Sequence, residues 1–148
     1  RSIELRKLVT SDLIDAKDKI INPLRIQKLK SAITIGELCK IIKEKLCIPN
    51  VRVVGDTAKL VKSYAICTGS GMSFSGNVKK KADVFITGDL KYHESLDASE
   101  LNQTIIDLGH YETEQFTPNL LMDVLQENFP TFAVLKSKVK TNPVEYFI

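Results

Sequence analysis

A histidine and a glutamate lie four residues apart just after an apolar segment of strand length. His110 and Glu114 follow Thr104–Leu108, and their spacing matches one turn of a helix. Both side chains could therefore aim at one point above a sheet. An imidazole nitrogen and a carboxylate oxygen together suit iron, zinc or manganese. The structural alternative is a first-turn glutamate favoured by the helix dipole beside a hydrogen-bonded histidine.

The second histidine of the sequence, His93, is a candidate proton-transfer group. It follows Asp89 by four residues and is followed by Glu94. Histidine titrates close to neutral pH and therefore suits general acid–base catalysis. The alternative is that His93 and Glu94 simply open a helix, where polar residues are ordinary. We treat His93 as a tentative catalytic residue.

Three strand-like segments are followed by unusually polar residues. The polar stretches are Cys67–Gly71, Thr87–Asp89 and Gly109–Glu114. The carboxyl ends of parallel strands meet at one edge of a sheet, where ligands bind in open α/β folds. If the strands are parallel, we expect the three segments to converge.

A glycine- and serine-rich loop, Thr68–Gly76, lies within this set. Its glycines could bring backbone amides close to an anion, but it lacks the Gly-Lys-Ser/Thr of a P-loop and the third glycine of a dinucleotide fingerprint. The alternative is a tight turn that requires small residues. The nucleotide-binding signal is therefore weak.

The bulk composition describes a globular chain without a strong field. Of the 148 residues, 43% are hydrophobic, and 21 basic against 18 acidic residues give a net charge of +3. This balance argues against nucleic-acid binding and membrane attraction. The basic run Lys79–Lys81 fits a solvated turn, with phosphate contact as the alternative.

The cysteine count and the apolar runs bear on the cellular compartment. Three cysteines without CxxC spacing, Cys39, Cys47 and Cys67, argue against both a disulfide framework and a cysteine zinc cluster. The apolar runs fall short of the roughly 20 residues of a membrane helix, and no leader pattern opens the chain. We expect a soluble, cytoplasmic protein.

Hydrophobic periodicity predicts alternating strands and helices. Thr34 and Glu37 match a capping box that begins a helix ending near Leu46. Further predicted helices span about 92–101 and 113–128. Predicted strands span 51–54, 60–67, 84–87, 104–108 and 131–135.

This order predicts an α/β fold, a three-layer domain with a mostly parallel sheet. Continuous apolar strands separated by helices are typical of parallel neighbours buried on both faces. We interpret residues 1–33 as a connector and residues 34–148 as the α/β domain. Asn22-Pro23 marks a break within the connector.

Two long segments, Ala82–Ala98 and Ile105–Glu114, closely resemble the NIF-three-like (NGG-one-interacting factor three) family. Ala65–Gly71 and the helix and strand at Thr34–Gly55 fit the same family, so the resemblance spans most of the chain from residue 34 to about 128. Many members carry the name GTP cyclohydrolase 1 type 2 homologue. The chain is similar to the carboxyl-terminal part of such proteins.

The resemblance implies a two-part α/β protein with two divalent metal ions in the cleft between its parts, commonly assembled as a hexameric ring. The family's His-x-x-x-Glu pair corresponds to His110 and Glu114. Its other ligands, a histidine pair and an aspartate, come from an amino-terminal part that has no counterpart in this sequence. Two of about five ligands should hold metal weakly.

Two functions follow from this resemblance. The first is a metal-dependent hydrolase, in which two ions activate water toward a substrate such as a nucleotide and His93 moves the proton. The second is a non-catalytic metal-containing protein that binds a regulatory or metabolic protein partner. The family's name favours an interaction partner, and the cyclohydrolase name that many members carry favours the enzyme.

Overall fold

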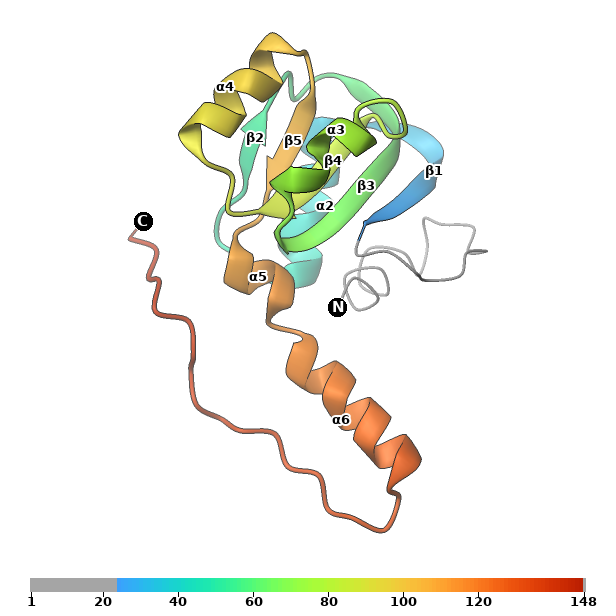
Figure 1. Cartoon of the computed structure of the whole chain (residues 1–148), viewed down its shortest axis with the longest axis vertical. Helices are drawn as coiled ribbons and strands as arrows, with labels where there is room; N and C mark the ends of the chain where they lie inside the picture. The colour runs from blue at the N-terminus through green and yellow to red at the C-terminus, as the bar shows by residue number, and fades with distance from the viewer. Residues whose placement is uncertain (1–23, 148) are drawn as a thin grey trace.

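Five strands form one sheet at the centre of the molecule (Figure 1). The computed structural model describes residues 24–147. The strands lie in the order β1-β3-β4-β5-β2. Their bounds are Arg25–Thr34 for β1, Arg52–Val54 for β2, Leu60–Ser70 for β3, Val84–Gly88 for β4 and Thr104–Asp107 for β5.

The strand directions confirm the parallel core of the predicted sheet and add antiparallel edges. β3 pairs with β4 and β4 with β5 in parallel, whereas β1 and β2 pair antiparallel with β3 and β5. Every residue of β4 and β5 is buried, as expected for strands covered on both faces. The carboxyl ends of β3, β4 and β5 therefore meet at one edge.

Helices cover both faces of the sheet, which confirms the three-layer prediction. α2 (Ile35–Leu46) packs its buried residues against one face, together with Ile86 and Ile106. Val78 of α3 (Ser75–Val78) and Ala98 of α4 (Tyr92–Glu100) pack against the other face. Figure 1 shows α3 and α4 in front of the sheet and α2 behind it.

The predicted capping box of α2 is present. The Thr34 hydroxyl accepts a hydrogen bond from the Glu37 backbone N–H at 3.1 Å, and the Glu37 carboxylate accepts one from the Thr34 N–H at 2.7 Å. Both orphan N–H groups are thus satisfied at the helix start. Cys47 follows the helix in a left-handed conformation with φ of 52°.

Strand β1 occupies a segment that the sequence assigned to the connector. The residues that it buries include Arg25 and Gln27, which are polar, and Leu29. Because two of these buried residues are polar, β1 lacks the alternation of apolar and polar residues that identifies a strand in a sequence. It nevertheless pairs with β3 over most of its length. Only residues 1–23 of the expected connector lie outside the described residues.

The carboxyl-terminal region differs from its prediction in two ways. The single helix expected over 113–128 is two helices, α5 (His110–Glu114) and α6 (Thr117–Asn128). The strand predicted at residues 131–135 is wrong, because residues 129–147 are irregular. A strand needs a neighbour for its backbone hydrogen bonds, and none of the strands in residues 24–147 pairs with this segment.

Residues 117–147, here named the α6–tail segment, stand apart from the layers. α6 projects from the α/β body, and the chain after it turns back beside the helix (Figure 1). α6 contains no buried residue. No helix within residues 24–147 combines the length and the apolar character needed to cross a membrane.

Candidate functional site

The three polar segments after β3, β4 and β5 converge, as predicted. The Thr87 hydroxyl at the end of β4 accepts a hydrogen bond from the Gly71 N–H at 3.0 Å and donates one to the Gly69 carbonyl at 3.2 Å. The Thr113 hydroxyl accepts from the Gly69 N–H at 2.8 Å. These buried bonds fix the carboxyl-terminal end of β3 and the residue that follows it against both α5 and β4.

His110 and Glu114 face each other across one turn of α5. Gly109, with φ of 87°, turns the chain so that α5 begins at His110. His110 Nε2 and Glu114 Oε2 are 3.4 Å apart, and their side chains are 49% and 26% exposed. The predicted pair therefore shares one partly open position above the sheet edge.

Asp89 orients His110 and was not among the predicted site residues. Its Oδ2 lies 2.5 Å from His110 Nδ1. This hydrogen bond, with the charges of Asp89 and Glu114, raises the pKa of His110 against the effect of burial. A carboxylate can only accept here, so Nδ1 carries the proton and Nε2 is directed toward Glu114. This is the arrangement in which carboxylates commonly orient metal-ligating histidines.

The separation of the two facing atoms fits a shared cation. Two ligands about 2.0–2.1 Å from a tetrahedral metal ion lie about 3.4 Å from each other. The His110 Nε2 to Glu114 Oε2 distance of 3.4 Å matches this value. The imidazole nitrogen and the carboxylate oxygen each offer a lone pair, so either a proton or a metal ion can bridge them.

Gly69 keeps the space beside this pair open. Its φ is +65°, and a Cβ at this position would lie 2.9 Å from Glu114 Oε1 and 3.3 Å from His110 Nε2. A side chain here would crowd both His110 and Glu114. The carboxyl-terminal end of β3 therefore contributes through the absence of a side chain.

The described residues could supply only part of a metal site. Within residues 24–147, no group of three or more histidine, cysteine, aspartate or glutamate side chains could hold a metal ion. Asp89 lies on the Nδ1 side of the His110 ring and not on the side that faces Glu114. The residues present fit two ligands and one orienting carboxylate.

Two neighbours of the pair have structural roles. Glu112 is buried and accepts hydrogen bonds from the Tyr146 hydroxyl at 3.0 Å and the Asn142 amide at 3.5 Å. Thr113 donates to the His110 carbonyl at 2.9 Å. Burial, followed by the contact with Glu112, raises the pKa of Tyr146. Glu112 thus holds the returning tail, and Glu114 faces His110.

A buried carboxylate that the sequence did not single out fixes the turns after β4 and β5. Asp107 accepts hydrogen bonds from the Gly109 N–H at 2.9 Å and the Leu90 N–H at 3.3 Å. It also forms an ion pair with Arg52, whose Nε lies 2.9 Å from Asp107 Oδ2. Its position at the end of an apolar strand was the available signal.

The structure does not bring His93 into contact with His110. His93 is exposed in the first turn of α4, and its ring meets Tyr92 edge-on at a centroid distance of 5.5 Å. Its proton-transfer role therefore stays a prediction. Lys79–Lys81 are exposed at the end of α3.

The cysteines contribute no donor to the facing pair. Cys39, Cys47 and Cys67 are free thiols, and burial raises the pKa of Cys39 and Cys67. For Cys67 the negative charge of Glu114 acts in the same direction. Both thiols are therefore kept protonated, whereas Cys47 is exposed.

Comparisons with known proteins agree with this architecture. A GTP cyclohydrolase 1 type 2 homolog of Staphylococcus aureus (strain MRSA252) is 34% identical over 140 residues, which are 91% of this chain and 38% of the relative. The Campylobacter jejuni protein of the same name is 36% identical over 119 residues, 80% of this chain and 47% of the relative. The chain thus spans less than half the length of these relatives.

A solved structure has the same fold. The crystal structure of Staphylococcus aureus protein SA1388 matches with a TM-score of 0.73 at 33% identity, over 84% of this chain and 42% of that one. The model of the family described as Duf34/NIF3 (NGG1p interacting factor 3) matches residues 7–143. The converging strand ends, the shared fold and this match lead to one conclusion: the chain belongs to the Duf34/NIF3 family.

Proposed function

We propose that this chain contributes His110 and Glu114 to the divalent-metal site of a metal-dependent hydrolase. The observation that carries the proposal is the 3.4 Å separation of His110 Nε2 and Glu114 Oε2 beside the gap at Gly69. Iron, zinc and manganese all accept this donor pair. When bound, such ions polarise water and substrate oxygen atoms for hydrolysis.

Each neighbouring residue has a defined task in this proposal. Asp89 holds the proton on His110 Nδ1 and fixes the plane of the ring. Thr113 and Thr87 hold the end of β3 that carries Gly69, through the Gly69 N–H and carbonyl. The Asp89 bond therefore preorganises the His110 ring, and the two threonines preorganise the strand end beside the pair. This favours binding because little ordering remains.

Two ligands leave a divalent ion weakly held, so further ligands must come from elsewhere. The relatives are more than twice as long as the matched region, and we place the remaining ligands in the part of the protein that this chain does not span. Two ions per complete protein are expected from the resemblance. Affinity rises with ligand number and with a preformed geometry.

The proposed substrate is a nucleotide with a hydrolysable ring. Support comes from the relatives, which carry the name GTP cyclohydrolase 1 type 2 homolog. His93 is the proposed proton carrier. Release of formate from GTP by the complete, metal-loaded gene product is the expected activity. A protein that binds metal and shows no turnover would instead support the non-catalytic interaction role.

The metal assignment is tested by elemental analysis of the complete gene product. We expect the double change His110→Ala and Glu114→Ala to remove most bound metal, because each residue supplies one of few ligands. Two matched single changes, His93→Ala and Glu100→Ala, alter exposed residues of α4 and should leave metal content at the wild-type value. Unchanged metal in the double variant would reject the assignment.

A further inference from the structure

A buried carboxylate at the end of β5 joins two turns of the candidate site. The Asp107 side chain is 2% exposed. Its Oδ1 accepts a hydrogen bond from the Gly109 N–H at 2.9 Å, and its Oδ2 accepts one from the Leu90 N–H at 3.3 Å. Leu90 lies in the turn after β4, and Gly109 lies in the turn after β5. One carboxylate therefore holds the two turns together.

Each of these turns carries one partner of the bond between Asp89 and His110. Asp89 directly precedes Leu90, and His110 directly follows Gly109. The backbone is left-handed at Asp89, with φ of 56°, and Gly109 has φ of 87°. A non-glycine residue keeps such a conformation where the surrounding structure holds it. The contacts of Asp107 therefore bear on how the Asp89 carboxylate meets the imidazole ring.

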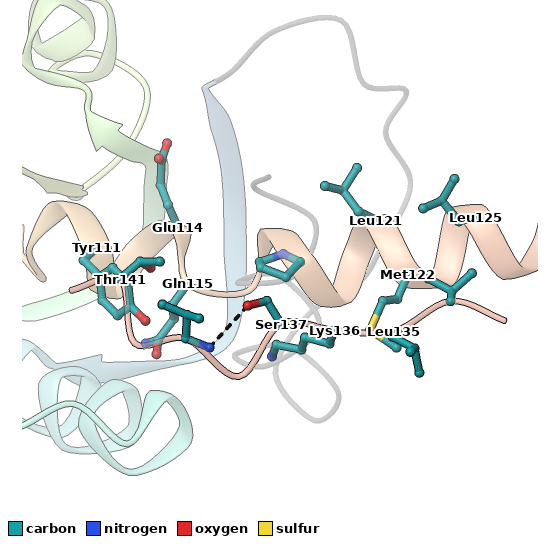
Figure 2. A pocket seen from close by; sticks show the side chains of 13 residues that line it. Tyr111, Glu114, Gln115, Leu121, Met122, Leu125, Leu135, Lys136, Ser137 and Thr141 are labelled. Carbon is teal, nitrogen blue, oxygen red and sulfur yellow. Dashed lines mark hydrogen bonds between the residues drawn. The ribbon is translucent and has the colours of Figure 1, made fainter.

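The turn at Gly109 also bears on the second donor. Gly109 directly precedes α5, whose five residues include both His110 and Glu114. Glu114 projects from α5 on the side away from Gln115 (Figure 2). Because α5 is little longer than one helical turn, its direction depends on the residue that starts it. A contact that fixes Gly109 therefore influences both donors.

Arg52 secures the carboxylate from a third strand. It lies opposite Asp107 in the antiparallel pairing of β2 with β5. Its Nε lies 2.9 Å from Asp107 Oδ2, and its Nη2 donates to the Leu90 carbonyl at 2.7 Å. A buried carboxylate without a positive partner is unfavourable, and the guanidinium supplies that partner. Arg52 thus binds the carboxylate and the turn after β4 at once.

Asp107 is placed to act on the site indirectly and not as a ligand. Both of its oxygens are engaged, with two backbone N–H groups and with Arg52. Asp89, Asp107 and Arg52 line one hollow of about 210 Å³, so the ion pair lies beside the carboxylate that orients His110. The ion pair therefore reaches the imidazole ring through the turns that it holds.

We propose that Asp107, held by Arg52, is a positioning residue of the proposed metal site: it keeps Asp89 against His110 Nδ1 and so keeps Nε2 directed toward the ion. The inference rests on the proposed function, since it concerns the same site. Loss of a partner that orients a metal-ligating histidine lowers metal affinity about 10- to 100-fold. Asp107 acts one step further from the ion, so we expect its loss to weaken binding about tenfold.

The Zn²⁺ affinity of the complete gene product, measured by competition with a chelating dye, tests this role. Asp107→Asn keeps the side-chain shape but removes the charge and one acceptor, and it should weaken Zn²⁺ binding about tenfold. Asp83→Asn is the matched control, because Asp83 also accepts from two backbone N–H groups, those of Lys62 and Ser63, but at the amino end of β4. It should bind Zn²⁺ as the wild-type protein does. Equal losses in the two variants would overturn the proposal.

A double change shows whether Asp107 acts through Asp89. Asp89→Asn alone should weaken Zn²⁺ binding about 10- to 100-fold. Adding Asp107→Asn should then weaken binding by a smaller factor than it does in the wild-type protein, because the bond that it positions is already altered. Factors that multiply in full would overturn the positioning role, and so would an unchanged affinity in Asp107→Asn alone.

Arg52→Lys is a second variant in case Asp107→Asn fails to fold. It keeps the positive charge, and the Arg52 side chain is 66% exposed, so the fold should tolerate the change. Lysine lacks the planar fork that reaches Asp107 and the Leu90 carbonyl together. Zn²⁺ binding should weaken, by a smaller factor than the one expected for Asp107→Asn. An affinity equal to that of the wild-type protein would overturn the proposal.

A readout without metal separates this inference from the proposed function. Nitrogen NMR of the metal-free complete gene product identifies which ring nitrogen of neutral His110 carries the proton, with the exposed His93 as internal reference. We expect the proton on Nδ1 in the wild-type protein and in Asp83→Asn, because Asp89 accepts it, and a shift toward Nε2 in Asp107→Asn. The same proton position in all three proteins would overturn the inference. Metal retained by the His110→Ala and Glu114→Ala variant would reject the proposed function, while the NMR result would still decide whether Asp107 positions Asp89.

Discussion

Two adjoining regions of the molecule differ in how their side chains are accommodated. One is the sheet edge where β3, β4 and β5 end, and the other is the α6–tail segment. At the sheet edge, buried hydroxyls and carboxylates such as Thr87 and Asp107 find partners within the body. In the α6–tail segment, large apolar side chains such as Leu135 face outward. The two regions meet between the end of α5 at Glu114 and the start of α6 at Thr117.

This contrast shows which contacts the chain supplies for itself. The core of the body is closed by α2 on one face and by α3 and α4 on the other. The α6–tail segment shows no comparable closure within the described residues. The candidate metal pair lies at the junction, complete in its orientation and incomplete in its ligands.

Truncation of a core residue should have the largest effect on the free energy of unfolding. It compares the buried body directly with the exposed α6–tail segment. Phe85 on β4 is fully buried, and Phe85→Ala should reduce the free energy of unfolding by about 3–5 kcal/mol. In the same 148-residue chain, Leu135→Ala should change it by less than about 0.5 kcal/mol, because Leu135 is 90% exposed. Urea unfolding measures both. A similar cost for the two changes would break the comparison.

Filling the gap at Gly69 should have an intermediate effect. Gly69→Ala places a methyl group at positive φ and within 2.9 Å of Glu114 Oε1, so it should lower the free energy of unfolding by about 1–3 kcal/mol. In the complete gene product it should also reduce bound metal. Gly76→Ala is the matched control, because open space surrounds Gly76 within α3. Metal content unaffected by Gly69→Ala would remove the gap from the proposed site.

The smallest effect concerns a polar contact of Asp83, at the amino end of β4 and away from the candidate site. Partial burial works to raise the pKa of Asp83, but hydrogen bonds from the N–H groups of Lys62 and Ser63 and from the Ser63 hydroxyl hold it below its ordinary value. The ionised carboxylate therefore stabilises the fold above the unfolded pKa, near 3.9, and this stability is lost as pH falls through the lower folded pKa.

Asp83→Asn should lower the free energy of unfolding at pH 7 by at most about 1 kcal/mol, since the site is exposed. It should also flatten the fall in stability below about pH 4. Thermal melts of both proteins from pH 7 to pH 2 measure this. If the melting temperatures of the two proteins fell equally with pH, the ionised Asp83 carboxylate would contribute nothing to the stability of the fold.

The sequence predicted the elements whose signals are local. The capping box at Thr34 and Glu37, the buried runs of β4 and β5 and the convergence of their polar ends are all confirmed. Strand β1 was missed because polar Arg25 and Gln27 are buried on it. The strand at 131–135 was predicted from composition, which cannot reveal whether a pairing edge exists.

The spacing of His110 and Glu114 was determined by the sequence alone, because four residues make one helical turn wherever the helix lies. The tertiary structure decided what surrounds that pair. Asp89 orients the ring from the end of another strand, and Gly69 leaves the open position from a third. These relations join residues 21 and 41 positions apart from His110, and only the parallel pairing of β3, β4 and β5 brings them together.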